Sequence, residues 1–385
     1  MEGHRTSGDV EKTATRLTAI LSSLLAIPTP NPPGNEAAAA EFLEKLFVPF
    51  GVPTRRIPLG PGRESLVVVL PGRRPDFVVL CGHLDTVPPA KDRWTYPPFE
   101  ATIKDERVYG LGAADMKGGV ASIADAALEL LESGIRTNHT VILAFTADEE
   151  GNMGGARSLV HAGLFAQTKF LVVTEPTDGQ VYVGEKRQLW LRVTLKGLAT
   201  HGSTPSAGRN AALAAADLAL RLEKLTCVKD WNEEVTFNVG RLVSGERVNA
   251  VPEYAELDLD VRFAEPSTGS TVLQKVYEMV RAVEAARQVT ATVTTLRHLP
   301  PLRTNPENVY VRTLTAAVNA VLTPCPQANL APFATDAKVI VPQTKIPFAV
   351  FGPGSIAQAH SPDEHVFLTS LVRTKIALAS FLRGL

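Results

Sequence analysis

The sequence contains few cysteines. Only Cys81, Cys227 and Cys325 occur in 385 residues, and none of them forms a Cys-x-x-Cys pair. An odd, widely spaced set gives no disulfide framework, and structural zinc sites are usually built from closely spaced cysteines and histidines. The sequence therefore does not indicate a disulfide-stabilised fold, and a purely structural zinc site fits it poorly. Cys81 is expected to be a small buried residue at a strand end, with a catalytic thiol as the alternative.

The sequence also lacks an excess of charge of either sign. The net charge is −1, and basic residues occur as scattered pairs such as Arg55-Arg56 and Arg73-Arg74. The basic residues form no stripe that would bind nucleic acid, and the net charge does not favour binding to an anionic membrane. No apolar run approaches the roughly 20 residues of a membrane helix, and the first 16 residues do not resemble a signal peptide. We therefore expect a cytoplasmic protein that binds neither nucleic acid nor membrane.

The length and the apolar pattern predict two domains, because 385 residues exceed a single small core. Short apolar runs alternate with helical segments in residues 1–179 and 296–385, which predicts an α/β fold with a mostly parallel sheet. Residues 180–295 instead alternate apolar and polar side chains around two helical segments, and residues 181–183 are expected to form the first strand there. This stretch is predicted to be an inserted, antiparallel α+β domain.

Short apolar runs lead to residues that can bind a metal. Buried parallel strands carry their sites just beyond their carboxyl ends, so these residues are expected to meet at one edge of a sheet. Histidines and carboxylates gathered in this way are typical of a two-metal hydrolytic site. The runs and the residues that follow them are 77–80 with His83 and Asp85, 141–145 with Glu149 and Glu150, 170–173 with Glu175, and 348–351 with His360.

Each of these residues has a simpler interpretation when it is taken alone. His83-Leu84-Asp85 could be a buried core histidine followed by a turn, and Asp115, in a glycine-rich segment, could be a turn residue. That segment is not a nucleotide-binding loop, because Lys117 is preceded by Met116 and followed by glycine. Glu149-Glu150 could be a solvated acidic turn. Two adjacent buried carboxylates would repel each other, unless one binds a metal and the other accepts a proton.

Two other histidines differ in their local context. His201 lies in a loop of small residues and by itself indicates only a loop histidine. His360 directly precedes Ser361-Pro362-Asp363-Glu364, a pattern typical of a helix start, and the last helix is expected to begin there.

Taken together, the motifs resemble one family. It is the family of co-catalytic zinc metallohydrolases that includes acetylornithine deacetylase, succinyl-diaminopimelate desuccinylase, aminoacylase and carboxypeptidase G. The resemblance extends from about Thr29 to the C-terminus, and residues 352–364 (GPGSIAQAHSPDE) are most similar to acetylornithine deacetylase. The motifs that carry it are TPNPPG at 29–34, HLDTVP at 83–88, GLGAADMKGG at 110–119, DEEG at 148–151, EPT at 175–177 and GPG at 352–354 with His360.

The resemblance implies a di-zinc site and a role for each residue. His83 and Glu175 would bind one zinc ion, Glu150 and His360 would bind the other, and Asp115 would bridge them. Asp85 would orient His83, and Glu149 would be the general base. The inserted domain would be a lid and dimerisation domain, from which His201 would reach the active site of the partner in a homodimer. Asn249 and Arg262 match positions that hold the carboxylate of the substrate.

The resemblance also implies hydrolysis of the amide bond of an N-acyl amino acid and favours Zn²⁺. Co²⁺ or Mn²⁺ could occupy a site of nitrogen and oxygen donors of this kind. Three other interpretations stay open at this point. The first is a dipeptidase or carboxypeptidase, the second is a succinyl-diaminopimelate desuccinylase, and the third is a catalytically silent binding protein on the same fold. The acyl group and the amino acid are not determined by these motifs.

Overall fold

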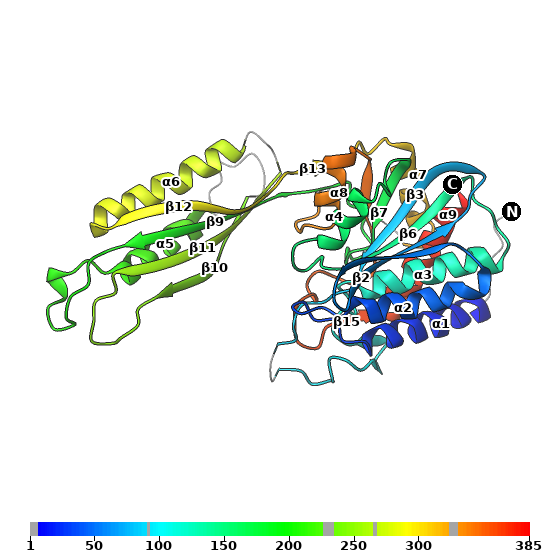
Figure 1. Cartoon of the computed structure of the whole chain (residues 1–385), viewed down its shortest axis with the longest axis horizontal. Coiled ribbons are helices and arrows are strands. Elements are labelled where there is room, and N and C mark those ends of the chain that lie inside the picture. The colour runs from blue at the N-terminus through cyan, green and yellow to red at the C-terminus, as the bar shows by residue number, and fades with distance from the viewer. Residues whose placement is uncertain (1–6, 91–92, 226–234, 265–267, 323–329) are drawn as a thin grey trace. The chain divides into compact units, whose positions relative to one another are not determined.

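The computed structural model describes residues 7–90, 93–225, 235–264, 268–322 and 330–385 (Figure 1). The chain forms two compact units. Unit 1 comprises Met1–Gly184, Arg303–Asn329 and Thr335–Leu385, and unit 2 comprises Glu185–Leu302 with Leu330–Ala334. The boundaries near Gly184 and Leu302 lie a few residues later than the 180 and 295 expected from the sequence. Cys227 and Cys325 lie outside the described residues.

Unit 1 is built on a six-stranded sheet with the order β1-β2-β6-β3-β7-β14. The last four strands in this order are parallel, while β1 and β2 form an antiparallel hairpin at one edge. The predicted α/β class with a mostly parallel sheet is therefore confirmed. The strands are β1 (Thr54–Gly60), β2 (Arg63–Leu70), β3 (Arg74–His83), β6 (His139–Thr146), β7 (Thr168–Val173) and β14 (Phe348–Val350).

Helices cover both faces of this sheet (Figure 1). One set of alternate strand residues, including Val78, Leu80 and Leu143, packs with α1, α2, α3, α7 and α9 in a single apolar core, and α4 and α8 lie on the opposite face. The helices are α1 (Ser7–Leu25), α2 (Glu36–Phe47), α3 (Lys117–Glu132), α4 (Gly154–His161), α7 (Val309–Asn319), α8 (Ala337–Thr344) and α9 (Leu368–Arg383), with a short 3₁₀ turn at Val48–Phe50. In these ranges no described helix is both long and apolar enough to cross a membrane.

A small second sheet in unit 1 corrects one expectation. It has the order β15-β5-β4, with β4 (Thr102–Lys104), β5 (Arg107–Tyr109) and β15 (His365–Phe367). The last helix does not begin at Ser361, because α9 starts at Leu368. His365 pairs with Tyr109, so residues that the helix-start pattern predicts in the first turns of the helix form strand β15 instead.

Unit 2 is a four-stranded antiparallel sheet with the order β10-β11-β9-β12 (Figure 1). Its two helices share one apolar core with the sheet, as the alternating pattern predicts. Residues 181–183 are not part of it, because Tyr182 forms an isolated bridge with Val350 in unit 1. The elements are β9 (Arg187–Lys196), β10 (Thr236–Ser244), β11 (Tyr254–Phe263), β12 (Thr290–Leu299), α5 (Ala211–Leu225), α6 (Thr268–Arg287) and a 3₁₀ turn at Pro205–Ala207. The short strands β8 (Gly184–Glu185) and β13 (Leu302–Arg303) pair where the chain passes between the units.

Candidate metal centre and active site

The parallel strands of unit 1 bring the predicted metal ligands to one edge of the sheet. His83 is the last residue of β3, Glu149 and Glu150 follow β6, and Glu175 follows β7 by two residues. The strand register aligns these ends, since His83 lies opposite Thr146 of β6. His360 arrives at the same edge after β14, and Asp115 lies two residues before the start of α3.

Close packing of α3 against the end of β7 helps to place Asp115. A side chain at Gly119 would put its Cβ 2.2 Å from the carbonyl oxygen of Thr174, the residue before Glu175. Only glycine allows this approach of the helix to the strand. The glycine-rich segment after Asp115 therefore brings the loop before α3 and the Glu175 loop together.

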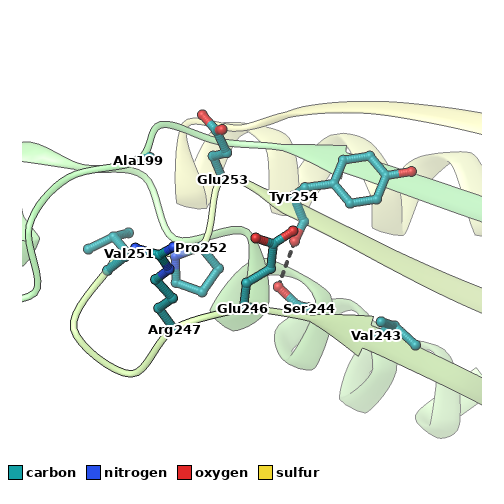
Figure 2. Close-up of a pocket in the computed structure, with 11 residues that line it drawn as sticks. Ala199, Val243, Ser244, Glu246, Arg247, Val251, Pro252, Glu253 and Tyr254 are labelled. Carbon is teal, nitrogen blue, oxygen red and sulfur yellow. Dashed lines mark hydrogen bonds between the residues drawn. The ribbon is translucent and has the colours of Figure 1, made fainter.

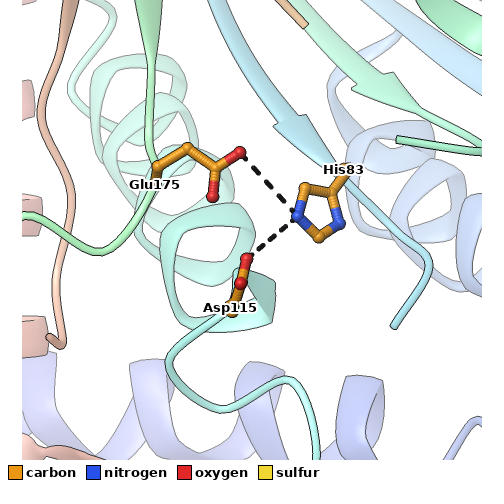
Figure 3. Close-up of side chains that lie close together, drawn as sticks. All are labelled: His83, Asp115 and Glu175. Carbon is orange, nitrogen blue, oxygen red and sulfur yellow. Dashed lines mark hydrogen bonds and ion pairs between the residues drawn. The ribbon is translucent and has the colours of Figure 1, made fainter. Parts of the chain in front are cut away.

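The first ligand group consists of His83, Asp115 and Glu175, all of which are buried (Figure 3). The His83 Nε2 atom lies 3.1 Å from Asp115 Oδ1 and 3.8 Å from Glu175 Oε1. Burial alone would lower the pKa of His83, but the carboxylates of Glu175 and Asp115 raise it well above its ordinary value. Burial raises the pKa of Glu175, with the Asp115 carboxylate adding to the effect. The group therefore favours a positive charge between its donor atoms.

The hydrogen bonding of His83 leaves one nitrogen available as a ligand. Nδ1 lies 2.9 Å from the backbone carbonyl oxygen of Asp85, which can only accept, so Nδ1 must donate. Nε2 faces the two carboxylates and is therefore the nitrogen that would give up its proton and offer a lone pair to a metal ion.

The second ligand group consists of Asp115, Glu150 and His360. The His360 Nε2 atom lies 2.8 Å from Glu150 Oε1 and 3.3 Å from Asp115 Oδ2. Hydrogen bonds with Asp115 and Glu150 raise the pKa of His360 to about 10. The two oxygens of Asp115 thus face two different histidines, which is the arrangement that a bridging carboxylate requires.

These residues fit two divalent cations. In each group the ligand atoms lie within 4.8 Å of one another, and the groups share Asp115. The donors are imidazole nitrogens and carboxylate oxygens, a set that suits Zn²⁺ and leaves room for Co²⁺ or Mn²⁺. The first group is buried, while in the second Glu150 is half-buried and His360 is exposed. Both groups are rich in carboxylates, so bound cations would relieve the repulsion among them.

Glu149 lies beside the ligand groups but belongs to neither of them. It is buried, and within the described ranges its carboxylate has no hydrogen-bond donor or ion-pair partner. Burial raises its pKa well above the ordinary value, while the nearby His83 opposes this shift. A buried carboxylate that is poised in this way can accept and return a proton.

The side chain of Asp85 holds the loop that carries Glu149 and Glu150. Its Oδ1 accepts a hydrogen bond from the backbone N–H of Glu149, and its Oδ2 accepts one from Glu150, both at 3.1 Å. The distance from Oδ1 to His83 Nδ1 is 3.7 Å, so the hydrogen bond that orients His83 comes from the backbone of Asp85. Burial raises the pKa of Asp85 to about 6.

Several polar residues around the site were not identified from the sequence. Glu364 is buried, and its Oε1 accepts hydrogen bonds from the backbone N–H groups of Ala114 at 2.9 Å and Asp115 at 3.0 Å. Asn31 and Arg63 also contact carboxylates on the loops that follow β3 and β6. The only sequence signals were the TPNPPG segment and the acidic residues after His360, and neither indicated these long-range contacts.

The remaining predicted residues lie in unit 2. His201 and Asn249 are exposed and lie in neighbouring loops, where Gly202 donates its backbone N–H to the Asn249 carbonyl oxygen at 2.8 Å. A cavity of about 310 Å³ adjoins these loops, lined by residues 243–247 and 250–254 with Ala199 (Figure 2). Arg262 lies near the end of β11, where its guanidinium group forms a two-point contact with Asp260.

The structure therefore brings the ligand candidates, Glu149 and Asp85 together in unit 1, and it places the three substrate-side candidates in unit 2. Residues 79–384 match the Peptidase family M20/M25/M40. The chain belongs to this family.

Individual relatives agree with the family assignment. An acetylornithine deacetylase of Proteus mirabilis is 30% identical over 359 residues, covering 90% of this chain and 88% of the relative. A succinyl-diaminopimelate desuccinylase of Gluconacetobacter diazotrophicus is 31% identical over 337 residues, covering 85% and 86%. The crystal structure of a tripeptidase from Staphylococcus aureus has the same fold, with a TM-score of 0.81 and 22% identity over 96% of this chain and 98% of that one.

Membership of the M20 family makes this chain a metal-dependent hydrolase of amide bonds, as the motifs predicted. The two ligand groups at the sheet edge are the candidate site for that chemistry.

Proposed function

We propose that this enzyme hydrolyses the amide bond of an N-acyl amino acid and releases the acyl group as a carboxylic acid. We further propose two Zn²⁺ ions as cofactors, one held by His83 and Glu175 and one by Glu150 and His360, with Asp115 between them. The observation that carries the proposal is the pair of ligand groups that share Asp115, next to a Glu149 carboxylate that, in the part of the chain that the structure describes, makes no hydrogen bond or ion pair.

The metal ions, when bound, would supply positive charge that lowers the pKa of a water molecule and stabilises the developing oxyanion. Glu149 would take the proton from the attacking water and then transfer it to the nitrogen of the departing amine. Asp85 would keep the Glu149 backbone in place through the hydrogen bond from that residue. His201 would donate a hydrogen bond to the oxyanion.

The positions of the substrate-side residues within unit 2 support a homodimer. Asn249 and His201 lie next to each other before β11 begins at Tyr254, whereas Arg262 lies at the other end of that strand. Eight residue steps at about 3.4 Å each place these ends about 27 Å apart. An N-acyl amino acid is much shorter than this distance. We therefore propose that Arg262 serves the site of its own subunit, while His201 and Asn249 serve the site of the partner.

An exposed surface of unit 2 is suited to this association. Leu213, Ala216 and Leu220 are exposed at helical spacing on α5, and α5 packs beside the edge strand β10. Leu242 and Val243 of that strand are also exposed. Soluble proteins normally cover an exposed edge strand and a neighbouring apolar helix face with another part of the chain or with a partner. A second copy of the chain would cover it symmetrically.

A panel of substrates would test the proposed reaction. Amine release would be measured with N-acetyl-L-ornithine, N-succinyl-diaminopimelate, other N-acyl amino acids and dipeptides, using metal-stripped and zinc-reloaded enzyme. We expect zinc-dependent release from one N-acyl amino acid, and the preferred acyl group distinguishes a deacetylase from a desuccinylase. Release from dipeptides alone would favour a peptidase. No release from any compound by enzyme with two bound metals would favour a catalytically silent protein.

A further inference from the structure

The segment at residues 29–34 lies against the loop that follows β3. Thr29 donates its hydroxyl to the carbonyl oxygen of Leu84 at 2.7 Å and accepts the backbone N–H of Thr86 at 3.0 Å. Asn31 then donates its backbone N–H to the carbonyl oxygen of Thr86 at 2.8 Å. These bonds surround Asp85 on both sides in the sequence. The segment is therefore held in a fixed register beside that residue.

The side chain of Asn31 links two carboxylates. Its Nδ2 atom lies 2.9 Å from Asp85 Oδ2 and 2.9 Å from Asp148 Oδ1. An amide nitrogen carries two hydrogen atoms, so Asn31 can donate to both oxygens at once. The opposite orientation of the amide would point its oxygen at two carboxylate oxygens, which is repulsive. Asp85 and Asp148 are buried, and a buried carboxylate is costly in free energy unless it accepts hydrogen bonds, so the two bonds donated by Asn31 stabilise both residues.

The two carboxylates hold opposite sides of the same loop. Asp85 accepts the backbone N–H groups of Glu149 and Glu150. Asp148 accepts those of Asn152 at 3.3 Å and Gly154 at 3.2 Å. Asp148 itself has a φ of 66°, a left-handed conformation that costs a non-glycine residue free energy and therefore needs surrounding contacts. The loop shape that presents Glu149 and Glu150 is fixed by these bonds.

The space around Asn31 is filled. A Cβ atom at Gly151 would lie 2.6 Å from Asp148 Oδ1 and 3.0 Å from the Asn31 amide nitrogen. Arg63 contacts Asp148 at 3.1 Å, and both it and Asp148 are bound by the buried carboxylate of Glu36. Among the described residues, Arg63 therefore forms an ion pair with Asp148 and not with Asp85. Asn31 is the side chain that joins Asp148 to Asp85.

We propose that Asn31 is a positioning residue for amide hydrolysis, which fixes Glu149 and Glu150 by binding the carboxylates of Asp85 and Asp148 with one amide group. The inference rests on the proposed function of Glu149 as the base and Glu150 as a ligand. Loss of the amide removes the one donor that the two carboxylates share, although each keeps its backbone N–H donors. Repulsion between the carboxylates then moves the loop that carries Glu149 and Glu150 and leaves the substrate-side residues in place. The expected effect is on kcat and on binding of one metal ion, with KM little changed.

The test uses two variants with matched controls. Asn31→Ser removes the double donor without adding charge, and Asn31→Asp replaces it with a third carboxylate of the same shape. Asn35, an exposed neighbour in the same segment, provides the controls Asn35→Ser and Asn35→Asp. Each protein is assayed for kcat and KM, for thermal unfolding, and for Co²⁺ binding by titration of the visible absorption bands.

We expect Asn31→Ser to keep a melting temperature close to that of the wild type. Its kcat should fall about 10- to 100-fold, and its affinity for one of two Co²⁺ ions should fall by a similar factor, as for other groups that support metal ligands. Asn31→Asp should be more severe, and both Asn35 variants should match the wild type. The cobalt titration remains informative if no substrate is hydrolysed, so failure of the proposed function is distinguished from failure of this inference.

Two results would overturn the inference. One is an Asn31→Ser protein with wild-type kcat and wild-type affinity for both cobalt ions. The other is a loss of kcat that only follows a large fall in melting temperature, which would assign Asn31 a role in folding. If Asn31→Asp fails to fold, Asn31→Ser alone still decides between these outcomes.

Discussion

Adjacent glutamates at one strand end should respond to the same substitution in opposite ways. Glu149 belongs to neither ligand group, whereas Glu150 binds His360 and faces Asp115 across the second group. We therefore expect Glu149→Gln to abolish proton transfer without loss of metal. Glu150→Gln should lose one metal equivalent, because a neutral amide is a poorer ligand than a carboxylate.

The sizes of the two effects follow from these positions. General acid–base catalysis contributes about 10²- to 10⁴-fold, so kcat of Glu149→Gln should fall by this factor, or about 2.7–5.5 kcal/mol in activation free energy. Glutamine has the same shape, and the backbone N–H of Glu149 would still be held by Asp85. The KM should therefore change little. In Glu150→Gln both metal stoichiometry and kcat should fall, and excess metal should restore part of the activity.

The assay combines steady-state kinetics with metal analysis by mass spectrometry after gel filtration. Both variants have the same change in charge at neighbouring positions, so each is the control for the other. The reasoning is refuted if Glu149→Gln loses a metal ion while Glu150→Gln retains both, since the two roles would then be exchanged. Wild-type kcat in Glu149→Gln would also exclude it as the base.

Three further predictions concern metal removal and buried charges. Chelation should destabilise unit 1, and reloading with metal at about 100 times its Kd should restore about 2.7 kcal/mol per site, as measured by thermal unfolding. Glu364→Ala should cost about 2–6 kcal/mol, because two buried backbone N–H groups lose their acceptor, whereas Glu364→Gln keeps an oxygen there and should cost less in chemical denaturation. Lys375→Met should lower the unfolding free energy by about 3–5 kcal/mol with kcat unchanged, because the Lys375 ammonium is fully buried against Asp125 and Glu129.

The sequence indicated which candidate metal ligands would come together, because their positions follow from local patterns. A short apolar run identifies a buried parallel strand, and the residue after it must lie at the carboxyl edge of the sheet. His83, Glu150 and Glu175 satisfy this rule directly. Asp115 was located only through its glycine-rich surroundings, and the close contact of Gly119 with Thr174 explains why those glycines are needed.

The residues that support the ligands could not be predicted in the same way. Asn31 contacts residues 54 and 117 positions away, and Glu364 contacts residues about 250 positions away. No periodicity relates such pairs. The pattern at residues 361–364 even favoured a helix, but pairing of His365 with Tyr109 and the bonds from Glu364 to the Asp115 loop stabilise a different local structure. Tertiary contacts decided this segment against its local propensity.

The ligand candidates lie in unit 1 and the substrate-side candidates lie in unit 2, and this separation explains why the sequence indicates the reaction more clearly than the substrate. Glu149 and most of the candidate ligands follow buried parallel strands, and Asp115 lies just before α3. Backbone pairing and the carboxylates of Asp85 and Glu364 restrict the movement of these loops. The substrate-side candidates lie on a separate antiparallel sheet, with His201 and Asn249 in exposed loops. Exposed loops tolerate substitution far better than a buried network of charges does. We therefore expect the choice of acyl group to depend on unit 2 and the hydrolytic reaction itself to depend on unit 1.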